Sequence, residues 1–193
     1  MDAENNSVIK EDIRLNLPNK LTVVRMVSTA LMVVFLLLDS RFADWMSVIL
    51  FLGASLTDFA DGYIARRDGL VTNLGKFMDP LADKILNYSV MVLLIPEGLI
   101  PPVGLVIILF REFLVSGIRQ SAVEQGVVIA ANIWGKIKTL FQDISLVAIL
   151  VFRAFGAGFL VPLSQILLWI CVALTVISGG IYLIQNIGVL KEQ

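Results

Sequence analysis

The chain has 193 residues, is 58% hydrophobic and has a mean hydropathy of +0.87, which argues against an ordinary soluble domain and suits one compact membrane unit. Its formal net charge of -1 argues against a nucleic-acid-binding protein, because such proteins carry a strong basic excess. The chain has no histidine and a single cysteine, so a Ser-His or Cys-His nucleophile pair is excluded and a zinc site is not expected.

The first 20 residues are polar and carry both signs of charge. They lack the apolar core and the cleavage site of a signal peptide. The larger apolar residues among them fall roughly on one helical face, and these are Val8, Ile9, Ile13 and Leu17. This pattern predicts a short helix on the membrane surface, so residues 1–20 are expected to form a cytoplasmic, juxtamembrane segment.

Six long apolar segments follow, and each predicts a membrane-spanning helix. They cover residues 21–38, 42–67, 73–95, 102–121, 132–152 and 160–184. The connections between them are short and leave no room for a separate soluble domain. The expected fold class is therefore an all-α membrane protein, with one six-helix transmembrane domain over residues 21–190.

The positions of lysine and arginine predict the orientation of these helices. Most of them lie in the amino-terminal segment, between the second and third helices, at the start of the fifth helix and in the tail. The opposite side offers only Arg41 and Arg153. Positive charge gathers on the cytoplasmic side of membrane proteins, so both termini are expected in the cytoplasm. The end of the second helix and the start of the third then open to the cytosol.

Two pairs of aspartates lie at that same end. Asp58 and Asp61 are three residues apart, so they share one helix face. Asp79 and Asp83 are four apart on the next helix, which the short connection makes an antiparallel neighbour. Four facing carboxylates would repel one another unless a cation joined them. Oxygen ligands without histidine or cysteine favour Mg²⁺ or Mn²⁺, and four aspartates can hold two such ions.

Small and cationic residues accompany the acidic pairs. Gly62, Ala65 and Gly75 remove bulk near the same faces and would let a phosphorylated ligand approach the backbone. Arg66 could grip a phosphate in bidentate fashion. The alternative is that the aspartates are solvated loop residues paired with nearby cations, and this interpretation is preferred for Asp68.

The spacing of these residues resembles the signature of the CDP-alcohol phosphotransferases. The matching pattern is Asp58-x2-Asp61-Gly62-x2-Ala65-Arg66-x8-Gly75-x3-Asp79-x3-Asp83. The resemblance implies a reaction in which an alcohol displaces CMP from a CDP-linked donor at a two-metal site. It also implies a homodimer in the bacterial plasma membrane.

The resemblance further implies roles for single positions. The implied metal ligands are Asp58, Asp61, Asp79 and Asp83. Of these, Asp58 and Asp79 are implied to bridge both ions. Asp83 is also the implied general base on the attacking hydroxyl. The positions implied to contact the cytidine diphosphate, or to leave room for it, are Gly62, Ala65, Arg66, Thr72 and Gly75. In the first helix, the candidates for contact with the donor head group are Asn19, Thr22 and Arg25.

Three stretches outside the motif resemble the members of this family that use CDP-diacylglycerol and glycerol 3-phosphate. They are NLPNKLTVVR at residues 16–25, REFLVSGIR at 111–119 and GKIKT at 135–139. An acceptor that already carries a phosphate needs positive charge, and charges within apolar segments are functional candidates. The candidate acceptor-phosphate ligands are Arg111, Arg119, Lys136 and Lys138.

Other interpretations of these features stay open. Arg111 could instead form an internal ion pair with Glu112, and Arg119 and Lys136 could extend their charged groups to the membrane surface. Within the family, the acceptor could be inositol phosphate, serine or phosphatidylglycerol. From another class, a divalent-cation transporter also lines a membrane cavity with aspartates, but no internal repeat is visible.

Overall fold

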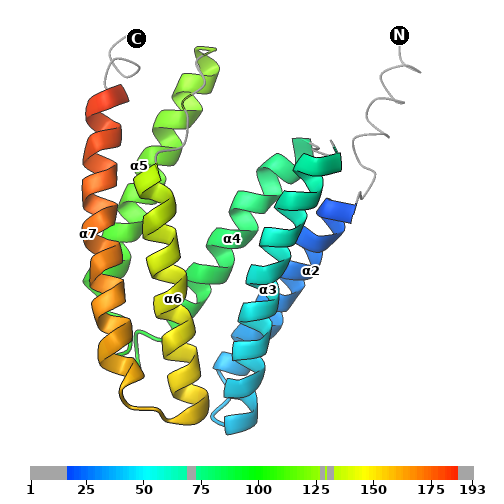
Figure 1. Ribbon diagram of the computed structural model, residues 1–193, viewed down its shortest axis with the longest axis vertical. Coiled ribbons are helices and arrows are strands. Elements are labelled where there is room, and N and C mark those ends of the chain that lie inside the picture. The colour runs from blue at the N-terminus through cyan, green and yellow to red at the C-terminus, as the bar shows by residue number, and fades with distance from the viewer. Residues whose placement is uncertain (1–16, 69–72, 127–128, 130–132, 187–193) are drawn as a thin grey trace. The chain divides into compact units, whose positions relative to one another are not determined.

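The computed structural model describes residues 17–68, 73–126, 129 and 133–186, and the part it describes is all-helical (Figure 1). The helices are α2 (Leu17–Leu36), α3 (Arg41–Asp68), α4 (Asn73–Leu93), α5 (Pro102–Glu124), α6 (Ile133–Phe155) and α7 (Leu160–Asn186). This confirms the all-α fold and the six predicted helical segments.

The largest difference from the predicted bounds is at the start of α2. This helix begins at Leu17, whereas the sequence predicts residue 21. Pro18 is tolerated in the first turn, where its missing N–H has no intrahelical partner to lose. The predicted surface helix within residues 1–20 falls mostly on residues 1–16, which lie outside the described residues.

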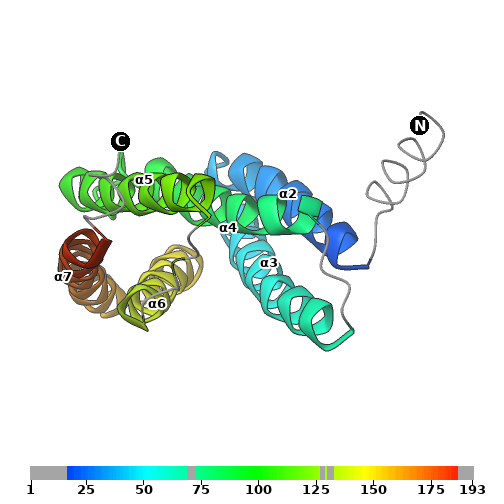
Figure 2. The same cartoon turned by 90° about the horizontal axis from the view of Figure 1, so that it is seen from above.

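The chain divides into two compact units, Met1–Leu93 and Leu94–Gln193. In the first unit α2 packs against both α3 and α4, and α3 also contacts α4. Figure 1 shows α3 and α4 running in opposite directions, as their short connection requires. In the second unit α7 packs against α5 and α6, an arrangement that Figure 2 shows from above.

The buried face of α2 is polar in its first half and apolar in its second. Residues on it recur every three or four positions, and these are Asn19, Thr22, Arg25, Thr29, Met32 and Leu36. The outer face of the same helix is apolar and carries Val23, Val24, Val27, Leu31 and Val34. This is the reverse of a surface helix in a soluble protein, which turns its polar face outward.

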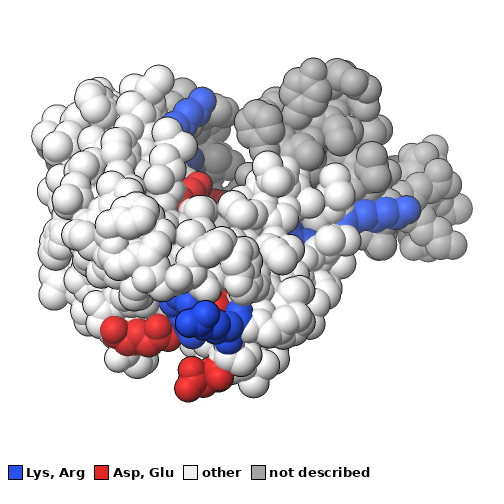
Figure 3. Space-filling view, turned by 60° about the horizontal axis from the view of Figure 1, so that its bottom comes forward, with Lys and Arg blue, Asp and Glu red and all other residues white. Residues whose placement is uncertain are grey.

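Helices α6 and α7 have the same reversed polarity. The polar side chains that they bury are Lys138, Gln142, Ser145, Ser164, Thr175 and Ser178. Outward they present large apolar residues, among them Leu140, Ile144, Ile166, Trp169, Val176 and Ile177. Uncharged residues also make up most of the described surface in view in Figure 3.

Among the described helices, two are long and apolar enough by length and composition to cross a membrane. They are Asn19–Leu36 within α2 and Leu160–Asn186, which is α7. The charges that lie within α3 to α6 lower the hydropathy of those helices, and the charged candidate functional residues of these helices are among them.

In the second unit, polar contacts fasten the connection between α4 and α5. Arg153 at the end of α6 lies 3.2 Å from Glu97, as measured from Nη1 to Oε1. Gln165 of α7 donates from Nε2 to the carbonyl oxygen of Leu99 at 2.5 Å. Gly98 between them has a φ of 71°, a conformation that a residue with a Cβ adopts at a cost. These contacts hold residues 97–99 against α6 and α7.

Leu146→Ala tests the packing of α6 against its neighbours. Leu146 is 0% exposed, so truncation leaves a cavity that costs about 2–5 kcal/mol and lowers the melting temperature by about 5–15 °C. Ile144→Ala is the control, because Ile144 is on the same helix and is 46% exposed. Thermal unfolding of the two purified variants measures the difference, and equal melting temperatures would contradict the described packing.

Candidate active site

The four candidate metal ligands lie on α3 and α4. Asp58 and Asp61 lie within about the last three turns of α3. Asp79 and Asp83 lie within about the first three turns of α4. The side chains of Asp79 and Asp83 are partly buried. The side chains of the other predicted residues in this region lie outside the described part of the structure. These residues are Asp58, Asp61, Ala65, Arg66 and Thr72, and the atoms around Gly62 are not described either.

Asp79 is tied to α2 by a short hydrogen bond. The hydroxyl of Thr22 donates from Oγ1 to Oδ1 of Asp79 at 2.5 Å, across 57 residues of sequence. Hydrogen bonds to an ionised carboxylate are shorter and stronger than neutral ones. Thr22 is buried and Asp79 is partly buried, so the bond is only partly open to water. The bond fixes one carboxylate oxygen of Asp79 relative to α2.

A row of residues spaced by four runs along α4 through both aspartates. It consists of Gly75, Asp79, Asp83 and Asn87, and residues at this spacing lie above one another on a helix. Gly75 and Asn87 are both buried. The sequence analysis missed Asn87, although its position one turn after Asp83 was a usable signal. Pro80 lies inside α4 and is exposed, and α4 stays continuous through it.

The three predicted donor residues of the first helix share one buried face. Asn19, Thr22 and Arg25 are each at most 4% exposed, and they lie on the side of α2 that packs against α3 and α4. Arg25 is 0% exposed, and the charge of a buried guanidinium must be compensated. Its own carbonyl oxygen accepts a 2.9 Å hydrogen bond from Oγ1 of Thr29. A cationic and hydrogen-bonding interior is therefore present beside Asp79.

The donor set on α4 fits a divalent cation by its chemistry. Carboxylate oxygens are the preferred ligands of Mg²⁺ and Mn²⁺, and Asp79 and Asp83 place two of them one turn apart. Among the side chains that the structure describes, no group of three or more acidic, histidine or cysteine residues gathers. The remaining predicted ligands, Asp58 and Asp61, are outside that set.

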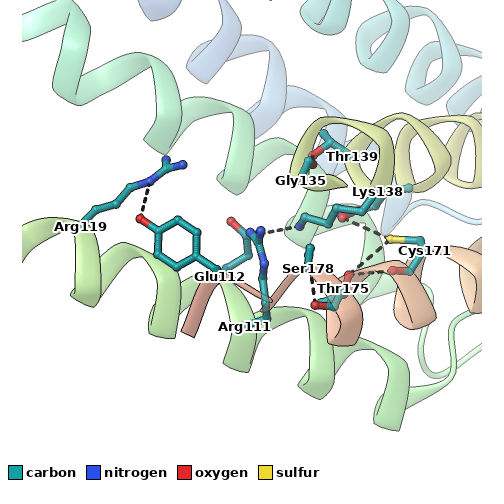
Figure 4. Close-up of polar contacts among 11 residues, drawn as sticks. Arg111, Glu112, Arg119, Gly135, Lys138, Thr139, Cys171, Thr175 and Ser178 are labelled. Carbon is teal, nitrogen blue, oxygen red and sulfur yellow. Dashed lines mark hydrogen bonds and ion pairs between the residues drawn. The ribbon is translucent and has the colours of Figure 1, made fainter. Parts of the chain in front are cut away.

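In the second unit, two predicted acceptor ligands meet at one carboxylate (Figure 4). Nη1 of Arg111 lies 2.8 Å from Oε1 of Glu112, and Nζ of Lys138 lies 2.5 Å from the same oxygen. Arg111 and Glu112 are on α5 and Lys138 is on α6. The internal ion pair that the sequence offered as an alternative is therefore present. The role of Arg111 and Lys138 as phosphate ligands stays a prediction.

The other two predicted acceptor ligands are exposed. Arg119 lies two turns beyond Arg111, and its Nε donates to the hydroxyl of Tyr182 at 3.2 Å (Figure 4). Lys136 is also exposed, although Lys138 two residues later on the same helix is buried. Exposure of long cationic side chains agrees with the alternative in which their charged groups reach the membrane surface.

Helix α7 brings further polar groups into the interior of the second unit. The hydroxyl of Thr175 donates to the carbonyl oxygen of Cys171 at 2.7 Å, and that of Ser178 donates to the carbonyl of Thr175 at 3.2 Å. Sγ of Cys171 lies 4.0 Å from Oε1 of Gln142 on α6. Bonds to the preceding turn satisfy hydroxyl groups within an apolar interior. This polar face was not predicted from the sequence.

Comparison with known proteins identifies the class of enzyme. The family described as CDP-alcohol phosphatidyltransferase matches residues 15–177, a range that includes the acidic motif and all the candidate cations. The chain belongs to this family. The family resemblance that the sequence analysis drew from the aspartate spacing is thereby confirmed.

Curated relatives show which members of the family this chain is similar to. A protein of Bacillus subtilis named CDP-diacylglycerol–glycerol-3-phosphate 3-phosphatidyltransferase is 39% identical over 191 residues, which cover 91% of this chain and 97% of the relative. A Rickettsia bellii protein of the same name is 38% identical over 169 residues, covering 86% and 93%. A chloroplastic and mitochondrial protein of Arabidopsis thaliana with this activity in its name is 32% identical over 183 residues, covering 88% and 62%.

Thr22→Val tests the bond that holds Asp79. Valine keeps the shape of threonine but cannot donate to Oδ1, and loss of a hydrogen bond to a charged group costs about 1.5–3 kcal/mol. Thr29→Val is the control, since Thr29 is equally buried on the same helix and bonds only to backbone. The unfolding temperature of Thr22→Val should fall further than that of Thr29→Val. Equal falls would show that the Thr22–Asp79 bond adds nothing to stability.

Proposed function

We propose that this protein transfers the phosphatidyl group of CDP-diacylglycerol to glycerol 3-phosphate, giving phosphatidylglycerophosphate and CMP in phospholipid biosynthesis. The observation that carries the proposal is the 38–39% identity, over most of both chains, to proteins named for this reaction. The acidic motif on α3 and α4 supports it, because it supplies the carboxylates that the reaction needs.

We further propose that all six helices span the bacterial plasma membrane, with both termini in the cytoplasm. The apolar outer faces of α2, α6 and α7 support this, together with the polar residues that these helices bury among apolar ones. A lipid-tailed donor can then stay in the bilayer while a water-soluble acceptor enters from the cytosol. Assembly as a homodimer stays a prediction.

The proposed metal site uses Asp58, Asp61, Asp79 and Asp83 as the ligands of two divalent ions, Mg²⁺ or Mn²⁺. When bound, such ions neutralise the pyrophosphate of the donor and stabilise the charge that builds on departing CMP. Thr22 keeps Asp79 oriented by its hydrogen bond to Oδ1. This role of Thr22 refines the sequence prediction, in which Thr22 was grouped with the residues that touch the donor.

In the proposed chemical step, the hydroxyl oxygen of the acceptor attacks the phosphorus of the phosphatidyl group. The carboxylate of Asp83 accepts the hydroxyl proton as the new P–O bond forms and the P–O bond to CMP breaks. Gly62, Ala65 and Gly75 leave room for the cytidine diphosphate. Arg66 and Thr72 bind it, and Asn19 and Arg25 contribute from α2.

The cations of the second unit are proposed to bind the phosphate of the acceptor. Arg111 and Lys138 are the main candidates, because both are largely buried and already converge on one point. Arg119 and Lys136 are exposed and contribute at most to attracting the anion. A zwitterionic acceptor such as serine would not need the buried cations of α5 and α6. Family membership likewise favours a transferase over the cation-transporter alternative.

An acceptor panel tests the proposed reaction. Purified protein with CDP-diacylglycerol, Mg²⁺ and glycerol 3-phosphate should release CMP and form phosphatidylglycerophosphate. Parallel reactions with serine, inositol phosphate or phosphatidylglycerol should release CMP at background rates. Product formation is followed with radiolabelled donor and separation of lipids. Turnover with another acceptor and none with glycerol 3-phosphate would reject the proposal.

Asp83→Asn tests the general base. The amide keeps the size of the side chain but accepts no proton at neutral pH, so kcat should fall by about 10²–10⁴-fold. Asp39→Asn is the control, because Asp39 is exposed in the turn between α2 and α3. Matched melting temperatures would show that both variants are folded. Wild-type turnover in a folded Asp83→Asn variant would remove Asp83 from the chemical step.

A further inference from the structure

The side chain of Arg111 takes a path that two glycines leave open. A Cβ built on Gly179 of α7 would lie 2.9 Å from Cγ of Arg111, closer than real Cβ atoms approach. A Cβ on Gly135 of α6 would lie 3.2 Å from its Nη2. The arginine therefore extends from α5 across α7 towards α6, where it meets Glu112 and Lys138 (Figure 4).

The cluster of Arg111, Glu112 and Lys138 is not balanced in charge. Two cations share a single carboxylate oxygen. The exposed fraction of the side chain is 12% for Arg111, 15% for Glu112 and 5% for Lys138. Nε of Arg111 is buried and has no hydrogen-bond partner among the described residues. A purely structural ion pair in such an interior would be neutral and saturated. The positive charge left over within these three side chains and the open donor of Arg111 both suit an anion.

We propose that Glu112 and Gly179 are positioning residues for the phosphate of the acceptor, an inference that rests on the proposed function. Glu112 holds Arg111 and Lys138 together through one oxygen, so that their remaining donors face a common anion. Gly179 supplies the space through which the stem of Arg111 reaches that point. Neither residue touches the reacting atoms, and both act through the two cations.

Glu112→Gln tests the first part of this inference. Glutamine keeps the volume but loses the charge that anchors both cations, and hydrogen bonds to charged groups correspond to about a tenfold effect or more. KM for glycerol 3-phosphate should rise about tenfold or more, while KM for CDP-diacylglycerol and kcat change less than about threefold. Glu112→Asp, which restores the charge, should recover part of the loss. An unchanged or lower KM for glycerol 3-phosphate, or equal rises for both substrates, would overturn the role of Glu112.

A double variant separates positioning from a general structural effect. Because Glu112 is proposed to act through Lys138 as well as Arg111, Glu112→Gln has less to disrupt once Lys138 is replaced. Glu112→Gln/Lys138→Gln should therefore raise KM for glycerol 3-phosphate over Lys138→Gln by a smaller factor than Glu112→Gln raises it over the wild type. Independent effects would instead multiply. A multiplied KM would therefore overturn the proposed coupling of the two residues.

Gly179→Ala tests the second part and does not remove a charge. The added methyl group displaces the stem of Arg111, so KM for glycerol 3-phosphate should rise by about tenfold. Gly180→Ala is the matched control, because a Cβ there meets nothing within 4 Å and the gain in helix propensity is the same. Equal kinetics in the two variants would overturn the role of Gly179. This pair also keeps the inference testable if Glu112→Gln does not fold.

The wild-type protein distinguishes the two levels of proposal. If it transfers no phosphatidyl group to glycerol 3-phosphate, the proposed function fails and this inference fails with it. If it does so, and Glu112→Gln and Gly179→Ala leave KM for glycerol 3-phosphate unchanged, the inference alone fails.

Discussion

A charge buried among helices with apolar outer faces must be compensated from within, and this constraint governs both halves of the structure. In the first unit, Thr22 of α2 donates to Asp79 of α4 at 2.5 Å. In the second, Oε1 of Glu112 is within ion-pair distance of both Arg111 and Lys138. The helices around these groups turn large apolar residues outward, and a charge in such surroundings is costly unless it has a partner.

The pair Asp79 and Asp83 and the cluster of Arg111, Glu112 and Lys138 carry net charges of opposite sign. On α4, Asp79 and Asp83 place two carboxylates on one helix face, and carboxylate oxygens are the donors that bind divalent cations. Among Arg111, Glu112 and Lys138 the positive charges exceed the negative charges by one, and charge-assisted hydrogen bonds from such cations bind a phosphate. A transferase that joins a nucleotide-activated lipid to a phosphorylated alcohol needs both kinds of site. The division of charge between the two units therefore agrees with the proposed reaction.

The sequence predicted the helices well because their physical signal is local. Apolar segments interrupted by Pro96, Pro101 and short polar connections fix where each helix begins and ends, and the observed bounds follow them closely. The aspartate spacing was equally readable, since residues three or four apart must share a helix face. The burial of Asn19, Thr22 and Arg25 together also follows from their spacing of three on one helix.

What the sequence by itself determined is thus the all-α architecture, the family and the rows of residues on single helices, because each depends on periodicity along the chain. Only the tertiary structure decided which rows meet across helices. Glu112 was offered from the sequence as an alternative partner of Arg111, but its contact with Lys138 joins α5 to α6 between residues that are 26 positions apart. Likewise, the missing side chain of Gly179 leaves room for Arg111 only because α7 packs beside α5. Such contacts depend on helix packing, and packing is set by the shapes of several surfaces at once, which no local pattern encodes.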